Sequence, residues 1–281
     1  MSSLMSTENV IYKFLPPERI SYLQDELLRI TQPGDLNDPF ECLPFPASQE
    51  ETIGIIEGLL AANIEKIKIS KIPKTQKKEE INLLESVYKA NITGVRKNKP
   101  GNLRDQYYKE SVAKINAALG ILSLTRRWDS TLMWSHYANS HKGFCIGLNI
   151  DDAFFKEYRD KLTGEIMFMA VQYADERIKV PMGKDERIDP FVMLRKSPDW
   201  KYEEEERLLV GLKKASKRIQ KKPFDIYLYK VPHSLIKEII AGANISDSDL
   251  NEIKRFCKEK NIVLYQSKIS EFKFDMTRIS I

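Results

Sequence analysis

The sequence predicts an α+β fold in which a mixed or antiparallel sheet forms the core of one domain, residues 1–281, with a helical insertion at residues 50–119. Short apolar or alternating segments suited to strands do not follow each other in the regular βα order of a parallel sheet. The chain also lacks GxGxxG and GxxxxGK[ST] segments, the glycine-rich loops that cradle phosphates in many such sheets. These observations favour α+β over a doubly wound parallel sheet.

The proposed insertion rests on helical spacing of apolar residues. The segment Glu50–Ile69 has this spacing, and Lys78–Ala90 and Leu103–Leu119 are predicted as further helices between polar connections with Pro or Gly. From residue 66 to residue 114, thirteen Lys or Arg stand against five Asp or Glu, a net charge of +8 in a chain of +5. Such a stretch can bind a polyanion, but a solvated helical face is the simpler interpretation because stacking aromatics are not interleaved with the lysines.

Composition limits the class of protein. Hydrophobic residues make up 42% and charged residues 30%, which fits a folded chain. The sequence contains no apolar run of about 18 residues and no secretory signal pattern at its start, so we expect a cytoplasmic protein without a membrane partner. The three cysteines, Cys42, Cys145 and Cys257, are widely spaced, which argues against both a disulfide framework and a zinc site.

The histidines also argue against a metal site. His136 and His141 are five residues apart, whereas two ligands on one helix face are expected at a spacing of four. Trp134, His136 and Tyr137 lie within one predicted helical turn, and their rings could stack on a nucleobase or a nicotinamide. The alternative is a helix that buries its tryptophan in the core and satisfies its histidine with a hydrogen bond.

Four consecutive glutamates, residues 203–206, precede an apolar strand. Alternation along a strand would place Glu203 and Glu205 on one face, with Arg207 following them, and Glu204 and Glu206 on the other. One carboxylate of such a pair can bind a ribose hydroxyl and stabilise an oxocarbenium-like centre, while the other orients or deprotonates a nucleophile. The alternative is a charged, solvent-facing start of a strand.

Two shorter polar segments complete the candidates. Ser123 and Thr125 end a predicted strand, and alternation puts both hydroxyls on one face, where they could support an active-site residue or bind a ligand. The alternative is ordinary polarity at a strand edge. Asn37–Phe40 is predicted to be a structural turn, since Asp38 before Pro39 favours extended backbone.

Several of these segments together resemble the bacterial family known as domain of unknown function 2971. They are Tyr12–Phe14, Asn37–Glu41, Ser123, Met133–Ala138, His141–Gly143, Val171 with Tyr173, Trp200 with Tyr202, Glu203, Glu205, Arg207 and Leu208, and Ile236–Gly242. The resemblance extends over nearly the whole chain. It implies no activity, because the family name records none.

A weaker resemblance is to ADP-ribosyltransferase domains of the arginine, serine, glutamate class, and it implies a split sheet. In that class a basic residue on the first strand, a hydroxyl-bearing middle strand and a glutamate motif bind and cleave NAD. The resemblance places Lys13 at the first position, Ser123 and Thr125 at the second, and Glu203 and Glu205 at the third. It implies that Glu205 is the main catalytic carboxylate, which holds the nicotinamide-ribose while its bond to nicotinamide breaks.

The same resemblance assigns NAD as a substrate and Trp134 or Tyr137 as the ring that stacks on nicotinamide. Apart from the resemblance, His136 is a further catalytic candidate. Two positions depart from the class. Lys13 stands where the class has arginine, and lysine cannot make a bidentate phosphate contact. Arg126 follows Thr125 where the class has a third hydroxyl. These departures imply either altered NAD binding or a domain without transferase activity.

The resulting hypothesis is an NAD-dependent ADP-ribosyltransferase-like effector, in a toxin or an anti-phage system, that modifies a protein or a nucleic acid. One alternative is a noncatalytic sensor or interaction module. Another is a nuclease-like effector, in which the basic helical segment binds a nucleic-acid backbone and acidic residues bind Mg²⁺.

Overall fold

The computed structural model describes residues 9–43, 45–97, 103–155, 166–180 and 190–281. Contacts within the chain group into two compact units. The first unit comprises residues 1–41, 116–175 and 196–281, and the second comprises residues 42–115 and 176–195. This grouping does not test whether the chain folds as one domain, which stays a prediction.

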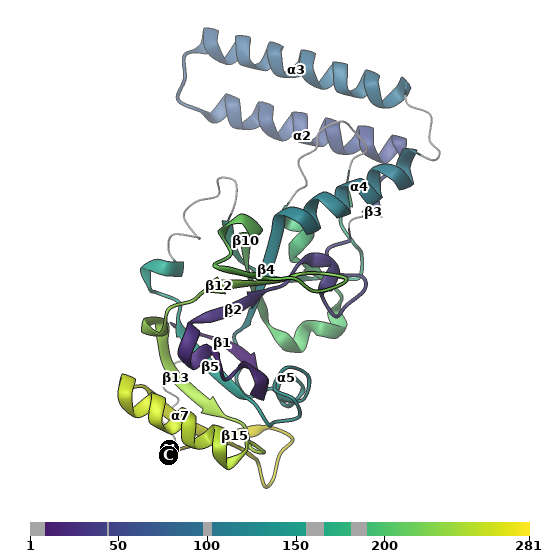
Figure 1. Ribbon diagram of the computed structural model, residues 1–281. Helices are drawn as coiled ribbons and strands as arrows, with labels where there is room; N and C mark the ends of the chain where they lie inside the picture. The colour runs from purple at the N-terminus through teal and green to yellow at the C-terminus, as the bar shows by residue number, and fades with distance from the viewer. Residues whose placement is uncertain (1–8, 44, 98–102, 156–165, 181–189) are drawn as a thin grey trace. The chain divides into compact units, whose positions relative to one another are not determined.

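An eight-stranded sheet forms the centre of the first unit (Figure 1). In order across the sheet, its strands are β15 (Met276–Ser280), β14 (Val263–Ile269), β13 (Ile236–Ala241), β5 (Phe144–Asn149), β1 (Val10–Leu15), β4 (Leu119–Thr125), β10 (Glu205–Gly211) and β6 (Ile166–Ala170). Neighbours are antiparallel except β13 and β14, which are parallel. The predicted α+β fold with a mixed sheet is therefore confirmed.

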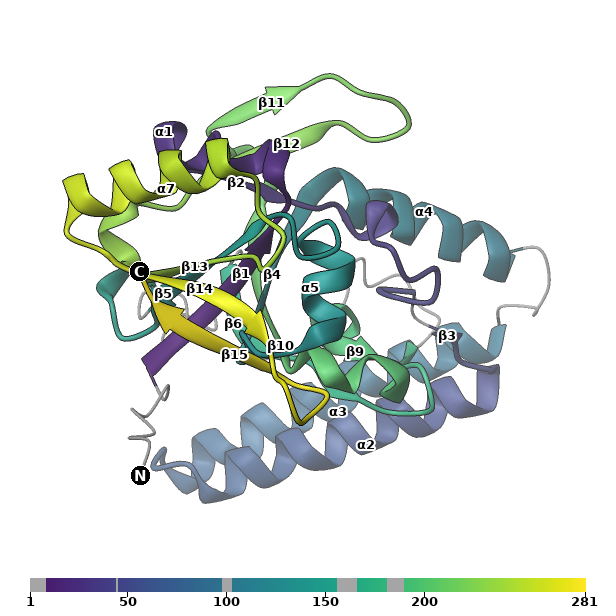
Figure 2. The same cartoon turned by 90° about the horizontal axis from the view of Figure 1, so that it is seen from below.

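Helices cover both faces of this sheet (Figure 2). Helix α7 (Asp247–Lys260) connects the parallel strands β13 and β14, as a parallel pair requires. Its apolar side chains share a core cluster with Ile11 and Leu15 of β1. The intervening Tyr12 and Phe14 belong to a second cluster with α5 (Thr131–Tyr137). Because side chains alternate along β1, one face of this strand packs with α7 and the opposite face packs with α5.

The sheet forks at β4. Seven residues of β4 pair with β10, but on the opposite side of β4 only Thr125 pairs with β1, through Tyr12. Farther along β4, Ile121 forms a bridge with Thr31, which follows β2 (Leu27–Ile30). Strand β2 belongs to a three-stranded sheet with β12 (Ile226–Lys230) and β11 (Lys217–Ile219). Strands β1 and β2 therefore lie on either side of an opening beside Ser123.

The similarity of this sheet to the fold of ADP-ribosyltransferases stays a prediction.

The second unit contains the helices expected between residues 50 and 119. Helices α2 (Gln49–Ile69) and α3 (Lys74–Lys97) lie side by side, and Asn63 donates a hydrogen bond to Tyr88 between them. Ser48 and Glu51 form a capping box that fixes the start of α2. A short parallel pair, β3 (Phe45–Pro46) with β8 (Lys179–Val180), also belongs to this unit. Within the described part of α2 and α3, only Thr52 and Val95 are buried, so most of this helix pair faces solvent.

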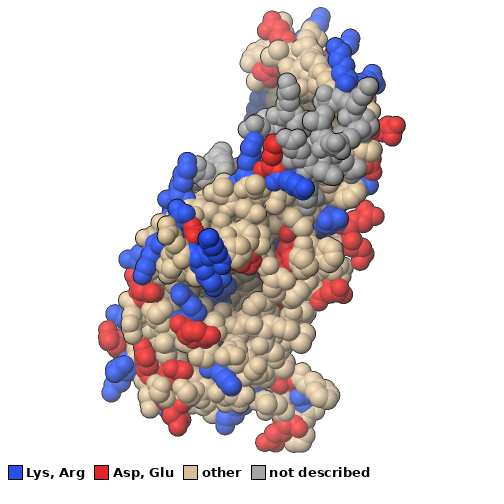
Figure 3. All heavy atoms as spheres, turned by 45° about the vertical axis from the view of Figure 1, so that its right-hand side comes forward, with Lys and Arg blue, Asp and Glu red and all other residues tan. Residues whose placement is uncertain are grey.

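The remaining α-helices and strands are α4 (Leu103–Ala118), which has 16 residues, and three short elements, α1 (Tyr22–Asp25), β7 (Gln172–Tyr173) and β9 (Arg195–Lys196). Within the described ranges, the helices are all too short or too polar to cross a bilayer. On the face shown in Figure 3, basic and acidic side chains are interspersed around broad uncharged areas.

Candidate functional site

A pocket of about 240 Å³ lies at the fork of the sheet, and every residue that lines it belongs to the first unit. Its walls come from β1, β2, β4, α5, the loop of residues 35–41 and the start of β10. Pockets for drug-sized ligands usually measure about 300–1,000 Å³. The pocket therefore suits a nucleoside-sized group better than a whole dinucleotide.

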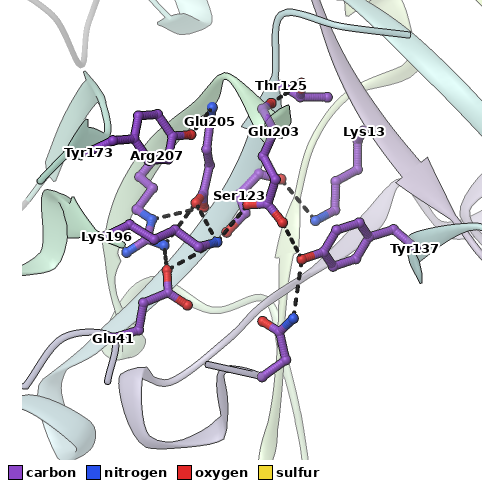
Figure 4. A network of polar contacts seen from close by, with 11 residues as sticks. Lys13, Glu41, Ser123, Thr125, Tyr137, Tyr173, Lys196, Glu203, Glu205 and Arg207 are labelled. Atoms are coloured by element: carbon purple, nitrogen blue, oxygen red, sulfur yellow. Dashed lines mark hydrogen bonds and ion pairs between the residues drawn. The ribbon is translucent and has the colours of Figure 1, made fainter. Parts of the chain in front are cut away.

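Lys196 is the centre of a buried network of charges beside this pocket (Figure 4). Its Nζ lies 2.6 Å from Glu203 Oε2, 3.2 Å from Glu205 Oε2 and 3.4 Å from Glu41 Oε1. The residue lies on β9, which pairs with β7. Its ammonium group holds two carboxylates that lie seven and nine positions later in the chain, and a third, Glu41, from a distant segment. Burial acts to lower the pKa of Lys196, but the charges of Glu205 and Glu203 outweigh it, and the pKa is raised.

Arg207 completes the network from β10. Its Nε and Nη2 donate to the two carboxylate oxygens of Glu205 at 2.8 and 2.9 Å, and Nη2 also donates to Glu41. The five charged groups of the network are three carboxylates and two cations, so their formal sum is −1. Burying charges is costly, so each member of such a network needs hydrogen bonds. Each of the five groups has at least one, but Glu41 Oε2 is buried and has no hydrogen-bond partner among the described residues.

Tyr137 connects the network to the open pocket. Its hydroxyl donates to Glu203 Oε1 at 2.5 Å and accepts from Asn37 Nδ2 at 3.2 Å. Burial and the charge of Glu203 raise the pKa of Tyr137, so the phenol stays protonated and remains a donor at neutral pH. Both oxygens of Glu203 are therefore held, one by Tyr137 and the other by Lys196.

Lys13 lies in the opening between β1 and β4. Its Nζ donates to the main-chain carbonyl of Ser123 at 2.9 Å. Burial lowers the pKa of Lys13 to about 8, although the charges of Glu205 and Glu203 oppose this shift. The ammonium group thus remains largely charged at neutral pH and has two donors left for a ligand.

The hydroxyls of β4 support the glutamates. Thr125 Oγ1 donates to the main-chain carbonyl of Glu203 and accepts from the amide of Arg127 at 3.0 Å, which fixes the turn before β10. The Ser123 side chain hydrogen-bonds Glu205, and this bond acts to lower the pKa of that carboxyl. Burial is nevertheless the larger influence, and the pKa of Glu205 is raised.

Six residues proposed from the sequence line this one pocket. They are Lys13, Ser123, Thr125, Tyr137, Glu203 and Glu205. They come from segments about 80 and 110 positions apart in the sequence, which the pairing of β1, β4 and β10 brings together.

Trp134 and His136 lie outside the pocket lining. Trp134 is fully buried, packs edge-on against Phe14 with ring centres 4.9 Å apart, and donates from Nε1 to the carbonyl of Trp128 at 2.8 Å. The expectation that Trp134 stacks on a ligand is therefore corrected, since the core already covers its ring. His136 is exposed, and it lies two positions along α5 from Trp134, on a different side of the helix.

The two glutamates meet for a different reason from the one expected. Glu203 is the last residue of a short 3₁₀ helix, Pro198–Glu203, and does not belong to β10. Glu204 then adopts a left-handed conformation with φ of 42°, and β10 begins at Glu205. The turn, more than strand alternation, points both side chains at Lys196. Glu206 faces elsewhere and pairs with Arg126, in agreement with the alternation predicted for β10.

Several residues of the site carried little signal in the sequence. Lys196 is one lysine among many and belongs to no pattern. Asn37 and Glu41 lie in the segment expected to be a structural turn, and its acidic end is buried against Arg207. Arg29, on β2, lines the pocket as well. Glu41 ends the segment Asn37–Glu41, which carries part of the resemblance to domain of unknown function 2971, and that resemblance is the signal that could have pointed to it.

Comparison with known proteins gives one match. Residues 133–208 match the model of a family described as protein of unknown function (DUF2971). The matched segment includes Tyr137, Lys196, Glu203, Glu205 and Arg207, and over this segment it supports the family resemblance predicted from the sequence. No curated protein and no solved structure matches the chain. Nothing in these comparisons supports the resemblance to ADP-ribosyltransferases.

Proposed function

We propose that the pocket binds the nicotinamide-ribose end of NAD and that the protein is an ADP-ribosyltransferase-like effector. The observation that carries the proposal is the convergence of Lys13, Ser123 and Glu205 in one pocket. These residues lie on three neighbouring strands, and the opening of the sheet beside Ser123 provides the space between them.

The charge of the site suits this substrate. The network around Lys196 and Arg207 has a formal charge of −1. The nicotinamide-ribose end of NAD is cationic, and positive charge moves onto the ribose as the glycosidic bond breaks. Carboxylates held in a buried site stabilise such a charge more strongly than water does.

In the proposed step, the bond between ribose C1′ and the nicotinamide nitrogen breaks, and both bonding electrons leave with nicotinamide. Glu205 lies beside the ribose, where it accepts a hydroxyl hydrogen bond and stabilises the oxocarbenium-like centre. The acceptor forms a bond to C1′ and loses a proton, which Glu203, the other glutamate of the pair, accepts. Arg207 positions Glu205 through two hydrogen bonds, and Tyr137 positions Glu203.

Tyr137 is also the aromatic ring available to the nicotinamide, because it lines the pocket and Trp134 is buried. The acceptor is a protein or a nucleic acid, and a role as a toxin or an anti-phage effector forms part of the same proposal.

A second candidate is a noncatalytic module that binds a ligand without cleaving it. One observation favours it: both oxygens of Glu203 and both oxygens of Glu205 already accept hydrogen bonds within the protein. A network satisfied in this way can serve to hold the fork of the sheet together. Binding of NAD without release of nicotinamide would distinguish this candidate from the transferase.

The test is release of nicotinamide from NAD by the purified protein, with a cell lysate supplied as acceptor. We compare the wild type with Glu205→Gln and, as a matched control, Glu204→Gln. Glu204 is adjacent in sequence, but its side chain is about half exposed and lies outside the pocket lining. Release should fall at least about a hundredfold in Glu205→Gln, the usual scale for losing one stabilising group, and stay near the wild-type rate in the control.

Circular dichroism and thermal unfolding establish that each variant is folded. Should Glu205→Gln fail to fold, Glu203→Gln replaces it, since Tyr137 and Lys196 can still bond the amide in part. Equal rates in the wild type and a folded Glu205→Gln would overturn the assigned role of this carboxylate. Absence of NAD cleavage and of NAD binding by the wild type would overturn the transferase proposal.

A further inference from the structure

Arg29 lines the same pocket from β2 and has donors that the protein does not use. Its Nη2 donates to the carboxylate of Asp35. Among the described residues, Nε and Nη1 have no hydrogen-bond partner, and Nε is buried. An arginine carries five N–H donors in a planar fork, and those on Nη1 remain open to a ligand, whereas the unpartnered Nε is buried.

Arg29 and Lys13 lie on the two strands that leave β4 at the fork, one on each side of the opening. Each lines the pocket, and the positive charge of Arg29 is among the influences that lower the pKa of Lys13. With Asp35, these groups have a formal charge of +1. The pocket therefore has a positive end at Arg29 and a negative end at the network around Lys196.

Two close cations with free donors are suited to a phosphoryl group. Guanidinium and phosphate form paired hydrogen bonds, and an ammonium group adds a compact point charge. A carboxylate ligand would match the charge as well, but its two oxygens share one carbon, so a bidentate contact with Arg29 leaves neither of them free for Lys13. A diphosphate offers oxygens to both.

We propose that Arg29 and Lys13 form a subsite for a diphosphate group, with Asp35 as its internal competitor. The identity of the ligand rests on the proposed function: in NAD the diphosphate follows the ribose that lies beside Glu205. Arg29 then supplies the bidentate phosphate contact that Lys13 alone does not make. Asp35 holds the guanidinium in place and weakens the site by its negative charge.

Because Asp35 is expected to compete with the ligand for Arg29, variants of the two residues should change binding in opposite directions. We measure binding of inorganic pyrophosphate, ADP-ribose and nicotinamide riboside to the wild type, Arg29→Gln and Asp35→Asn by titration calorimetry. Arg29→Gln should weaken ADP-ribose and pyrophosphate about ten- to hundredfold, the range for a hydrogen bond to a charged group. Asp35→Asn should strengthen both, because it removes the competing anion. Nicotinamide riboside, which lacks the diphosphate, should bind all three proteins within about twofold.

A merely structural Arg29–Asp35 pair predicts that both variants weaken all ligands to the same degree, and that result would overturn the subsite. So would pyrophosphate and ADP-ribose affinities that do not change in Arg29→Gln. Failure of the proposed function would give a different result from failure of the subsite. If pyrophosphate and ADP-ribose bind in an Arg29-dependent way while nicotinamide riboside does not bind and NAD is not cleaved, the subsite stands and the transferase does not. If NAD is cleaved with the same KM in all three proteins, the transferase stands and the subsite does not.

Discussion

At the scale of single residues, Lys13 lines the proposed ligand pocket, and its burial lowers the stability of the folded protein. Its amine lies in the opening of the sheet, where burial lowers its pKa from 10.5 to about 8. Between these two pH values the unfolded chain still binds the proton at this residue, whereas the folded protein has released it. The contribution of Lys13 to the free energy of unfolding therefore increases with pH between these two values.

Removal of the Lys13 amine should therefore change how stability depends on pH. The free energy of unfolding of the wild type, minus that of Lys13→Met, should increase from about pH 8 to about pH 10.5, by at most about 3 kcal/mol. Below pH 8 the difference should be flat. Urea unfolding of both proteins at a series of pH values measures it, and other titrating groups cancel in the difference. Parallel curves from pH 7 to pH 10.5 would contradict the assigned environment of Lys13.

The glutamates show how far residue-level reasoning from sequence reaches. Their joint orientation was predicted, but the cause is a left-handed turn at Glu204, which strand alternation does not describe. Lys196 could not be predicted, because what makes it different from the other lysines is its burial against three carboxylates. Two of them follow it by seven and nine positions, but the third, Glu41, comes from a distant segment, and no local pattern marks the group. Trp134 was misassigned because its covering partner, Phe14, lies on β1, about 120 positions earlier in the chain.

At the scale of elements, the connection between α5 and β5 depends on close backbone contacts. Asn139, Ser140 and His141 all have positive φ values, of 47°, 55° and 66°. Gly242, at the end of β13, passes so near this turn that a Cβ atom would lie 2.1 Å from the His141 carbonyl oxygen. Glycine is required here because the neighbouring atoms are backbone and cannot rotate away.

Replacement of this glycine should therefore be costly. Gly242→Ala is expected to destabilise the protein by at least about 2 kcal/mol, since overpacking against backbone forces a shift of either β13 or the turn. Gly58→Ala is the matched control: it lies in α2 with open space around it, and it should stabilise the helix by up to about 1 kcal/mol. Thermal unfolding of the two variants measures both effects. A Gly242→Ala protein as stable as the wild type would show that the turn and β13 are not in close contact.

The elements themselves were largely predictable where a local pattern exists. Helical spacing predicted both ends of α2 and of α4 to within one residue. Helix α3 extends beyond its predicted range at both ends. The resemblance to ADP-ribosyltransferases implies a split sheet, but local patterns could not locate the fork, because its place depends on which strands pair with β4. The single pairing of Tyr12 with Thr125 and the bridge from Ile121 to Thr31 leave no periodic trace in the sequence.

At the scale of the whole molecule, the two units differ in how much of their chain is buried. Strand β5 is buried over five consecutive residues, Phe144–Leu148, whereas α2 and α3 bury one residue each within their described parts. Regions with few buried contacts open more readily, and their amides exchange faster.

Hydrogen exchange followed by mass spectrometry should therefore separate the units. Amides of α2 and α3 are expected to exchange at least about tenfold faster than those of β4 and β5 at the same pH and temperature, a difference of about 1.4 kcal/mol in opening free energy. Equal protection across both units would contradict this prediction and indicate that the helices are covered by a contact that their exposure does not show.

The central claim is that the fork of the sheet is an NAD site, with the ribose at Glu205 and the diphosphate at Arg29. The most direct measurement is a crystal structure of the protein with carba-NAD, an analogue whose bond to nicotinamide is not cleaved. The account predicts the nicotinamide end in the pocket beside Tyr137 and Glu205, and the diphosphate between Lys13 and Arg29. A bound analogue located outside this pocket, or an empty pocket at saturating concentrations of the analogue, would contradict it.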